Sequence, residues 1–193
     1  MPVRFLCLPF LLVTLCGCLA TTGQRYADPH TLATYVQKKS SVYEPYTTYI
    51  GPEIQSGLSN YRLRSFVDNE TGLALHQIYV QTTYQHSEWV SWEQARSDEG
   101  LSLEFTSIDT KVEGCTAWRN CVYTEQFGVK IDDDYMRSRA GIGGSVKVYA
   151  HNGSEAVLTL PPNYIQAQLL AIDPLTVSPG FTPAAVQSVP PSE

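Results

Sequence analysis

A two-residue alternation of apolar and polar side chains recurs along most of this chain and constrains its fold more than any other feature. Alternate residues of a strand point to opposite faces of a sheet, so the pattern is typical of strands with one buried face. Strands are predicted at 46–54, 61–67, 73–84, 101–112, 121–131, 146–150 and 156–160. Gly51 and Pro52 interrupt the first, which is therefore expected to be bent or to lie at an edge.

Turn residues between the strands predict that neighbours in sequence pair as hairpins. Residues 68–72 join two long strands, and Asn152-Gly153 is a strong hairpin signal before the last one. Short helices are expected at 29–39, 132–139 and 163–172, from apolar spacing, Pro at helix starts and the order of charges. Residues 85–100 are interpreted as a loop or a broken helix.

These elements predict a single mainly β globular domain over residues 28–173. Its expected form is an antiparallel β-sandwich of about seven strands with short peripheral helices. The alternative is an α+β fold in which helices cover a single curved sheet. Residues 174–193 hold five prolines and few large apolar groups, so a disordered tail is predicted there.

The first twenty residues have the three-part layout of a bacterial export signal. Arg4 gives a basic start, residues 5–15 carry no charge, and the small residues Gly17 and Ala20 follow. A run of eleven uncharged residues is too short to remain in a bilayer as a spanning helix. The pattern therefore predicts export and removal of this segment.

Residues Leu15, Cys16, Gly17 and Cys18 resemble the lipobox of bacterial lipoproteins, with Leu at −3, Gly at −1 and the acceptor Cys at +1. Cys16 departs from the pattern, because Ala, Ser or Thr is usual there. The resemblance implies cleavage before Cys18, a diacylglycerol on its sulfur, and an acyl chain such as palmitate on the new amino group. Three acyl chains would anchor the protein firmly, since a single chain binds a membrane only marginally.

On this interpretation residues 1–17 are the signal peptide and 18–27 are a short lipidated leash. Leu19, rather than Asp, follows the acceptor cysteine, which implies the periplasmic face of an outer membrane. Ordinary signal cleavage after Ala20 is the alternative, and it would leave a soluble periplasmic protein.

The cysteine count predicts one disulfide. Cys7 and Cys16 leave with the signal and Cys18 takes the lipid, so Cys115 and Cys121 remain as a pair in an oxidising compartment. Because the two lie at the ends of consecutive predicted strands, their disulfide should staple a hairpin. A redox pair is the less favoured alternative, since those usually have the spacing Cys-x-x-Cys.

Few residues suggest catalysis or metal binding. No Gly-x-Ser-x-Gly, His-Glu-x-x-His or phosphate-loop motif is present. The four histidines are scattered, and only His76 and His86 form a plausible pair. Asp132 to Asp134 are interpreted as a helix start rather than a calcium loop. We therefore expect no metal and no cofactor, and the sequence leans against an enzyme.

The most suggestive candidate surface is aromatic. Tyr84, Trp89 and Trp92 lie close together in the sequence, among charged residues, and aromatic side chains on loops often serve binding. The alternative is that both tryptophans close the end of the sandwich. The net charge of −6 argues against nucleic acid as a ligand, because such binders need a basic face.

Together these features predict a membrane-anchored periplasmic lipoprotein that acts without catalysis, as an accessory, adaptor or ligand-binding module of the cell envelope. Its expected partners are the membrane, through the N-terminal lipid, and an envelope protein or cell-wall glycan. The competing hypothesis is a protein that binds or hydrolyses cell-wall glycan with the aromatic segment 84–100. A subunit of a larger secretion or pilus-type assembly is a third possibility.

Overall fold

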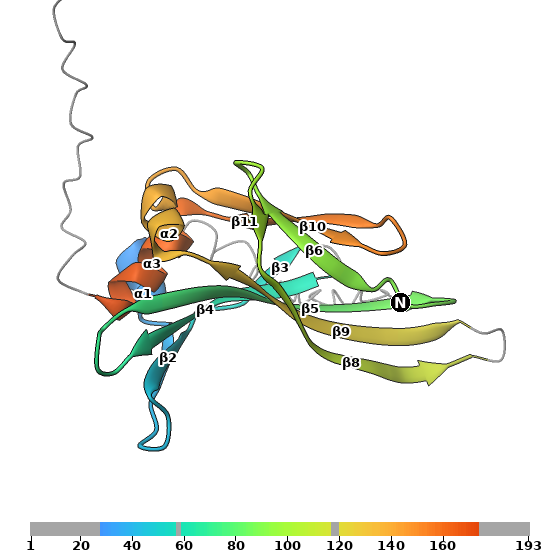
Figure 1. Ribbon diagram of the computed structural model, residues 1–193, viewed down its shortest axis with the longest axis horizontal. Coiled ribbons are helices and arrows are strands. Elements are labelled where there is room, and N and C mark those ends of the chain that lie inside the picture. The colour runs from blue at the N-terminus through green and yellow to red at the C-terminus, as the bar shows by residue number, and fades with distance from the viewer. Residues whose placement is uncertain (1–27, 57–58, 117–119, 174–193) are drawn as a thin grey trace, which may run out of the picture.

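The computed structural model describes residues 28–56, 59–116 and 120–173, and this part of the chain is mainly β, as predicted (Figure 1). In chain order its elements are α1 (Pro29–Ala33), β1 (Gln37–Lys39), β2 (Tyr46–Ile50), β3 (Ile54–Ser56), β4 (Ser59–Asp68), β5 (Ala74–His86), β6 (Trp92–Ser97), β7 (Ser102–Leu103), β8 (Phe105–Cys115), β9 (Cys121–Ile131), α2 (Asp133–Arg139), β10 (Gly144–Ala150), β11 (Glu155–Leu160) and α3 (Pro162–Ile172). The signal peptide, Cys18, the leash and the tail at 174–193 lie outside the described residues.

The strands form two antiparallel sheets. The larger has seven strands in the order β1-β2-β4-β5-β9-β8, with β3 also paired to β4, and the smaller has the order β11-β10-β6-β7. Their apolar faces meet in one core, which confirms the sandwich over the single curved sheet. The described strands number eleven rather than about seven, because β3 and β7 were merged into longer predicted strands, β1 was predicted as helix, and β6 was predicted as a loop or broken helix.

The core residues follow the predicted alternation. On β4 the inward side chains Tyr61 and Leu63 are buried, and on β5 the same holds for Ile78 and Val80. They pack against residues of the smaller sheet, including Val146, and against apolar residues of α3. The predicted hairpins β4–β5 and β10–β11 are both present, with positive φ angles at the turn residues Gly72 and Gly153.

The three helices gather at one end of the sandwich, and the hairpin β8–β9 extends to the other end (Figure 1). Helix α2 has aspartates in its first turn and arginines in its last, as the charge order predicted. None of the helices in the described part of the chain is long and apolar enough to cross a bilayer.

The break at Gly51 and Pro52 is also confirmed, and α3 explains it. A Cβ atom on Gly51 would lie 2.8 Å from the Tyr164 hydroxyl and 2.8 Å from Gln168 Oε1. The same Tyr164 hydroxyl accepts a hydrogen bond from the Leu63 N–H and donates one to the Pro52 carbonyl. The strand therefore ends where the helix must approach its backbone.

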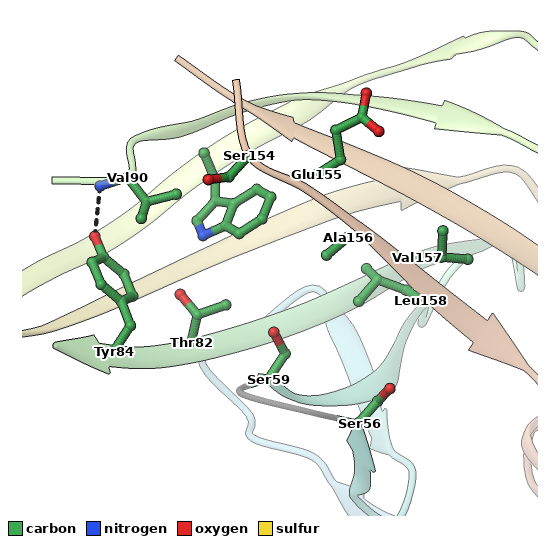
Figure 2. Close-up of a pocket in the computed structure, with 11 residues that line it drawn as sticks. Ser56, Ser59, Thr82, Tyr84, Val90, Ser154, Glu155, Ala156, Val157 and Leu158 are labelled. Carbon is green, nitrogen blue, oxygen red and sulfur yellow. Dashed lines mark hydrogen bonds between the residues drawn. The ribbon is translucent and has the colours of Figure 1, made fainter. Parts of the chain in front are cut away.

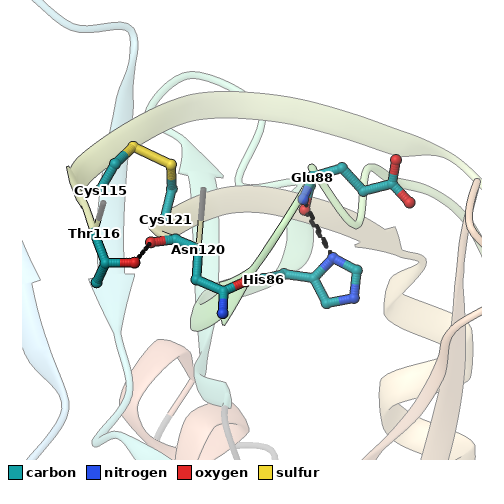
Figure 3. Close-up of a disulfide and its surroundings, with 6 residues drawn as sticks. All are labelled: His86, Glu88, Cys115, Thr116, Asn120 and Cys121. Carbon is teal, nitrogen blue, oxygen red and sulfur yellow. Dashed lines mark hydrogen bonds between the residues drawn. A yellow bond between two sulfur atoms is a disulfide. The ribbon is translucent and has the colours of Figure 1, made fainter. Parts of the chain in front are cut away.

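The predicted disulfide is present. Cys115 and Cys121 are directly opposite on β8 and β9 and join the two ends of this hairpin (Figure 3). Just beyond the bridge, Thr116 donates its N–H and its hydroxyl to the carbonyl of Asn120. The bridge and these bonds together hold the tip of a hairpin whose outer strand, β8, is almost entirely exposed.

The helix predicted at 29–39 is wrong beyond its first turn and a half. Helix α1 ends at Ala33, and residues 37–39 form β1, which pairs with β2. The predicted N-cap is correct, because the Asp28 carboxylate accepts a hydrogen bond from the Thr31 N–H. Thr34 bonds back to the Thr31 carbonyl, and the open edge of β2 offers the following residues better backbone partners than another helical turn.

The interpretation of 85–100 as a loop or broken helix is wrong for its second half. Residues 92–97 form β6, a central strand of the smaller sheet between β10 and β7. A register shift opposite Tyr149 and Ala150 breaks the two-residue alternation, which hid the strand. The strand predicted at 101–112 is likewise divided, since β7 belongs to the smaller sheet and β8 to the larger.

Candidate functional site

A cleft of about 350 Å³ opens between the two sheets, and two of the predicted aromatic residues line it (Figure 2). Tyr84 stands at the end of β5 and Trp92 at the start of β6. The opposite wall is the edge strand β11. Apart from the charged Glu155, the remaining lining residues are small, hydroxylated or aliphatic: Ser56, Ser59, Thr82, Val90, Ser154, Ala156, Val157 and Leu158.

A buried carboxylate holds the aromatic wall of this cleft. Glu125 lies on β9 and is only 5% exposed. Its two oxygens accept hydrogen bonds from the Ser91 N–H at 3.0 Å, from the Trp92 N–H at 3.1 Å and from the Tyr84 hydroxyl. Such a carboxylate is stable in the interior because each of its strong acceptors has a donor. Glu125 thereby fixes the turn between β5 and β6.

Tyr84 completes this arrangement. While its hydroxyl donates to Glu125, it accepts a hydrogen bond from the Val90 N–H at 2.9 Å. Burial, together with the bond to Glu125, raises the pKa of Tyr84 above its ordinary value, so the phenol stays protonated. Ser91 has a positive φ of 60°, a conformation that its hydrogen bond to Glu125 helps to maintain.

Trp92 faces both the core and the cleft. Its ring lies 6.0 Å from the ring of Phe127, centroid to centroid, while its side chain also lines the cleft. The indole Nε1–H is buried and has no hydrogen-bond partner among the described residues. A buried donor without an acceptor is uncommon in folded proteins, and it is a feature that a ligand could satisfy.

Trp89, the third predicted aromatic residue, does not line the cleft. Its ring packs on Tyr123 at 4.5 Å between centroids, and Tyr123 also stacks on Tyr84 at 5.7 Å. The three rings are in contact in series, and of the three only Tyr84 lines the cleft. The alternative, in which both tryptophans close the end of the sandwich, therefore holds only in part. Trp92 contacts Phe127 of the core, whereas Trp89 supports the wall of the cleft through Tyr123.

A serine, a histidine and an aspartate also meet, at the helix end of the sandwich. His76 Nε2 lies 3.0 Å from Asp133 Oδ1, and its Nδ1 lies 2.8 Å from Ser65 Oγ. Ser65 in turn accepts a hydrogen bond from Gln168 at 2.9 Å. Both Ser65 and His76 are 0% exposed, so this serine cannot reach a substrate. The array resembles a catalytic triad only in its residue types, and it serves to join β4, β5, α2 and α3.

Burial lowers the pKa of His76 below its ordinary value, and the bond to Asp133 opposes this only in part. The imidazole is therefore neutral at pH 7, with its proton on Nε2 facing the carboxylate. Nδ1 then accepts from Ser65. Asp133 is also bonded by Arg137 at 2.6 Å, so its charge has a cation close by.

The remaining predicted candidates do not converge. His76 is buried at one end of β5, whereas His86 is exposed at the other and bonds to the backbone of Glu88 (Figure 3). Another histidine, His151, has its Nδ1 3.6 Å from Glu93 Oε2. In the part of the chain that the structure describes, no group of three or more His, Cys, Asp or Glu side chains could hold a metal ion.

Sequence reasoning assigned no role to Glu125 and considered His76 only as a possible metal ligand together with His86, although a signal for their true roles was present. Both occupy inward positions on strands whose other inward residues are apolar, such as Ile78 and Phe127. A charged or titratable side chain at such a position must find internal partners. That rule identifies both residues as centres of buried networks, but it does not reveal their partners.

The chain matches no protein-family model, no curated protein and no solved structure.

Proposed function

We propose that this protein is a lipid-anchored module of the bacterial cell envelope that binds a ligand in the cleft between its sheets and does not catalyse a reaction. Cys18 would carry the lipid, as the lipobox-like signal implies, and would hold the domain at the periplasmic face of the outer membrane. The observation that carries the binding function is the cleft lined by Tyr84 and Trp92.

Three properties of this cleft favour binding over simple packing. Its aromatic wall is held rigid by Glu125, so little entropy would be lost when a ligand binds. Trp92 offers an indole N–H that has no partner among the described residues. The other wall is an edge strand, β11, which borders the cleft with residues 154–158.

The chemistry of the lining favours a ligand with both hydroxyl groups and an apolar face, as a sugar ring has. Ser56, Ser59 and Thr82 provide hydroxyls that donate or accept, and Tyr84 and Trp92 provide aromatic surface. Cell-wall glycan is the ligand of this kind that a periplasmic protein meets. We therefore propose cell-wall glycan as the first ligand to test.

The test is sedimentation of the mature full-length chain with purified cell wall, comparing the natural protein with Trp92→Phe. The substitution keeps an aromatic ring near Phe127 but removes the Nε1 donor, and a lost hydrogen bond corresponds to roughly a tenfold weaker affinity at most. Trp89→Phe is the matched control, since Trp89 does not line the cleft. We expect weaker binding for the first variant and unchanged binding for the second.

Equal loss of binding in both variants, or no sedimentation of the natural protein, would contradict a glycan site in this cleft. The supernatant is analysed for soluble wall fragments in the same experiment. Their release by the natural protein would favour the competing hydrolase hypothesis over a non-catalytic module.

A further inference from the structure

The outer face of the larger sheet, which points away from the smaller sheet, carries its side chains in ordered rows. Residues directly opposite on neighbouring strands share a face, so the strand register defines each row. One row runs Lys39, Thr48, Phe66 and Leu75 across β1, β2, β4 and β5. The next runs Gln37, Ile50, Arg64, Gln77 and Lys130 and also reaches β9. The two rows are about 7 Å apart, the rise of two residues in a strand.

The first row continues into an exposed apolar edge. Tyr46 packs edge-to-face on Phe66 at 5.5 Å between ring centroids, and both Tyr46 and Leu75 remain exposed. Beyond them, the loop between β1 and β2 projects from the body of the domain on the side away from β10 and β11 (Figure 1). It presents Val42, 94% exposed, and Tyr43, 92% exposed.

Ordinary packing does not account for this loop. Its neighbours bond only through the backbone and polar groups, since Asn69 donates to the carbonyls of Pro45 and Glu44. The valine and the tyrosine at the tip are thus held in place without being covered. An aromatic ring with a polar end, next to aliphatic side chains, is the combination that favours the boundary of a membrane.

The second row is cationic. The Arg64 guanidinium lies 3.5 Å from the centroid of the Tyr79 ring, and its Nε is buried without a hydrogen-bond partner. Among the described residues, no carboxylate forms a salt bridge with Arg64. By contrast, its neighbours Arg62 and Lys130 are paired with Glu53 and Glu104, at 2.7 and 3.2 Å.

Within the described ranges neither Lys39 nor Arg64 forms a salt bridge, so both leave positive charge on this face, although the protein as a whole is acidic. A stacked, half-buried guanidinium is already oriented and partly desolvated before a ligand arrives. It is suited to a phosphate, which guanidinium groups bind through two parallel hydrogen bonds.

We propose that this face docks on an anionic phospholipid surface, with Val42 and Tyr43 entering the headgroup boundary and Lys39 and Arg64 meeting lipid phosphates. The positions of these residues support this occupant. Val42 and Tyr43 are outermost on the projecting loop, and both cations lie behind them, Lys39 in the first row where the loop begins and Arg64 in the second row. An approaching protein meets the charged headgroups of a bilayer first and the apolar acyl chains below them. Apolar residues at the tip of the loop and cations behind the tip therefore match the order of these layers.

This inference is independent of the cleft and of any ligand bound there. It concerns the opposite face of the larger sheet, and its readout below is local to the β1–β2 loop. A negative result for glycan binding would leave it unaffected.

The test places an environment-sensitive fluorophore, NBD, on the mature full-length chain through Val42→Cys. Position 42 is exposed, and Cys115 and Cys121 are joined to each other, so the new thiol can be labelled selectively. The labelled protein is reconstituted with phosphatidylcholine vesicles, with and without phosphatidylglycerol as one lipid in three. Asn152→Cys, at the exposed β10–β11 turn of the other sheet, is the matched control.

We expect a severalfold rise in emission from residue 42, with protection from iodide quenching, only in the vesicles that contain phosphatidylglycerol. The label at residue 152 should respond equally to both vesicles. Arg64→Gln and Lys39→Gln, each combined with the label at residue 42, should reduce the rise. Because Lys39 is fully at the surface, its variant remains informative even if Arg64→Gln weakens the fold.

Three results would overturn the proposal. If the NBD emission at residue 42 stays at the level seen in water with both kinds of vesicle, the loop does not insert. An equal rise with both vesicles would remove the role of lipid charge. A rise that depends on protein concentration without vesicles would assign the face to a second copy of the chain.

Discussion

The two ends of the sandwich each contain a buried polar network, and the two networks differ in what they border. At the helix end, His76 connects Ser65 and Asp133 and is sealed from solvent. At the hairpin end, Glu125 binds Tyr84 and the backbone of the β5–β6 turn, next to an open cleft. The central residue of each network is an inward-facing side chain of the larger sheet, His76 on β5 and Glu125 on the neighbouring strand β9.

The comparison shows that a familiar set of residue types does not make a site. Ser65, His76 and Asp133 are linked in series at the helix end, yet Ser65 and His76 are fully buried, so no substrate can reach the serine or the histidine. At the other end, Glu125 does not line the cleft itself. It positions Tyr84 and Trp92, which do line the cleft. Access, rather than residue identity, distinguishes a structural network from one that supports a binding site.

Replacing Glu125 should have the largest effect on this comparison. Glu125→Ala leaves two backbone N–H groups and a phenol without their acceptor, so we expect the free energy of unfolding to fall by about 3 kcal/mol. Glu125→Gln retains one oxygen acceptor and should cost about 1 kcal/mol. Urea unfolding of both variants measures the difference. Equal, small losses would show that the carboxylate is not the centre of this end.

Removing the disulfide should come next. In the chain-entropy model, closing so short a loop stabilises by about 2 kcal/mol, so a Cys115→Ser, Cys121→Ser double variant should lose about that much. The loss should be confined to the hairpin end, since the bridge joins only β8 and β9. Hydrogen exchange would locate it. Faster exchange around His76 in this variant would contradict the independence of the two ends.

The helix end should respond to pH. Because the pKa of His76 is lowered in the folded state, the unfolded chain binds the proton first as the pH falls below about 6.5. Stability is thus complete above that pH and should decline below it, by at most about 1.4 kcal/mol per pH unit. Burial raises the pKa of Asp133, but the bonds from Arg137 and His76 outweigh this effect, so its pKa is lowered overall. Protonation of Asp133 should therefore cause a similar decline in stability only at more acidic pH.

Urea unfolding between pH 7 and pH 5 measures this decline, with His76→Gln as the control. The variant keeps an amide that can bond to Asp133 or Ser65 but does not titrate. Its stability should therefore depend less on pH than that of the natural protein. Identical pH profiles would show that another group is responsible.

The smallest change tests the link between the Glu125 network and the cleft. Tyr84→Phe removes the hydroxyl that joins Glu125 to the Val90 N–H, at an expected cost of about 1 kcal/mol in unfolding free energy. Tyr135→Phe, far from the cleft, provides a comparable loss of a hydroxyl that binds Asp98. Binding to purified cell wall should weaken only in the Tyr84→Phe variant. If both variants bind equally well, the phenol has no role in the site.

Much of the fold could be predicted because its signals are local. The hairpins β4–β5 and β10–β11 follow from alternation and turn residues, and the Cys115–Cys121 pair follows from the cysteine count. The failures occurred where local preference was weak. Residues 37–39 could continue a helix or pair with β2, and only the open edge of β2 decided between them.

The candidate site was predictable only in part. Tyr84, Trp89 and Trp92 stood out as aromatic residues, but the sequence could not separate the two that line the cleft from the one that supports its wall. The hidden strand β6 is the reason. The register shift on this strand directs Trp92 toward Phe127, and no periodic pattern in the sequence indicates this change of direction.

By itself, the sequence determined the strands with clear alternation, the turns between them and the cysteine pair, since each depends on residues close together in the chain. The alternation also contains a signal that was not used, since His76 and Glu125 share their strand faces with apolar residues such as Ile78 and Phe127. Only the tertiary structure decided which partners they meet, because those partners lie on strands and helices distant in sequence. The same holds for the cleft and for the outer face, which exist only once the register of several strands is set.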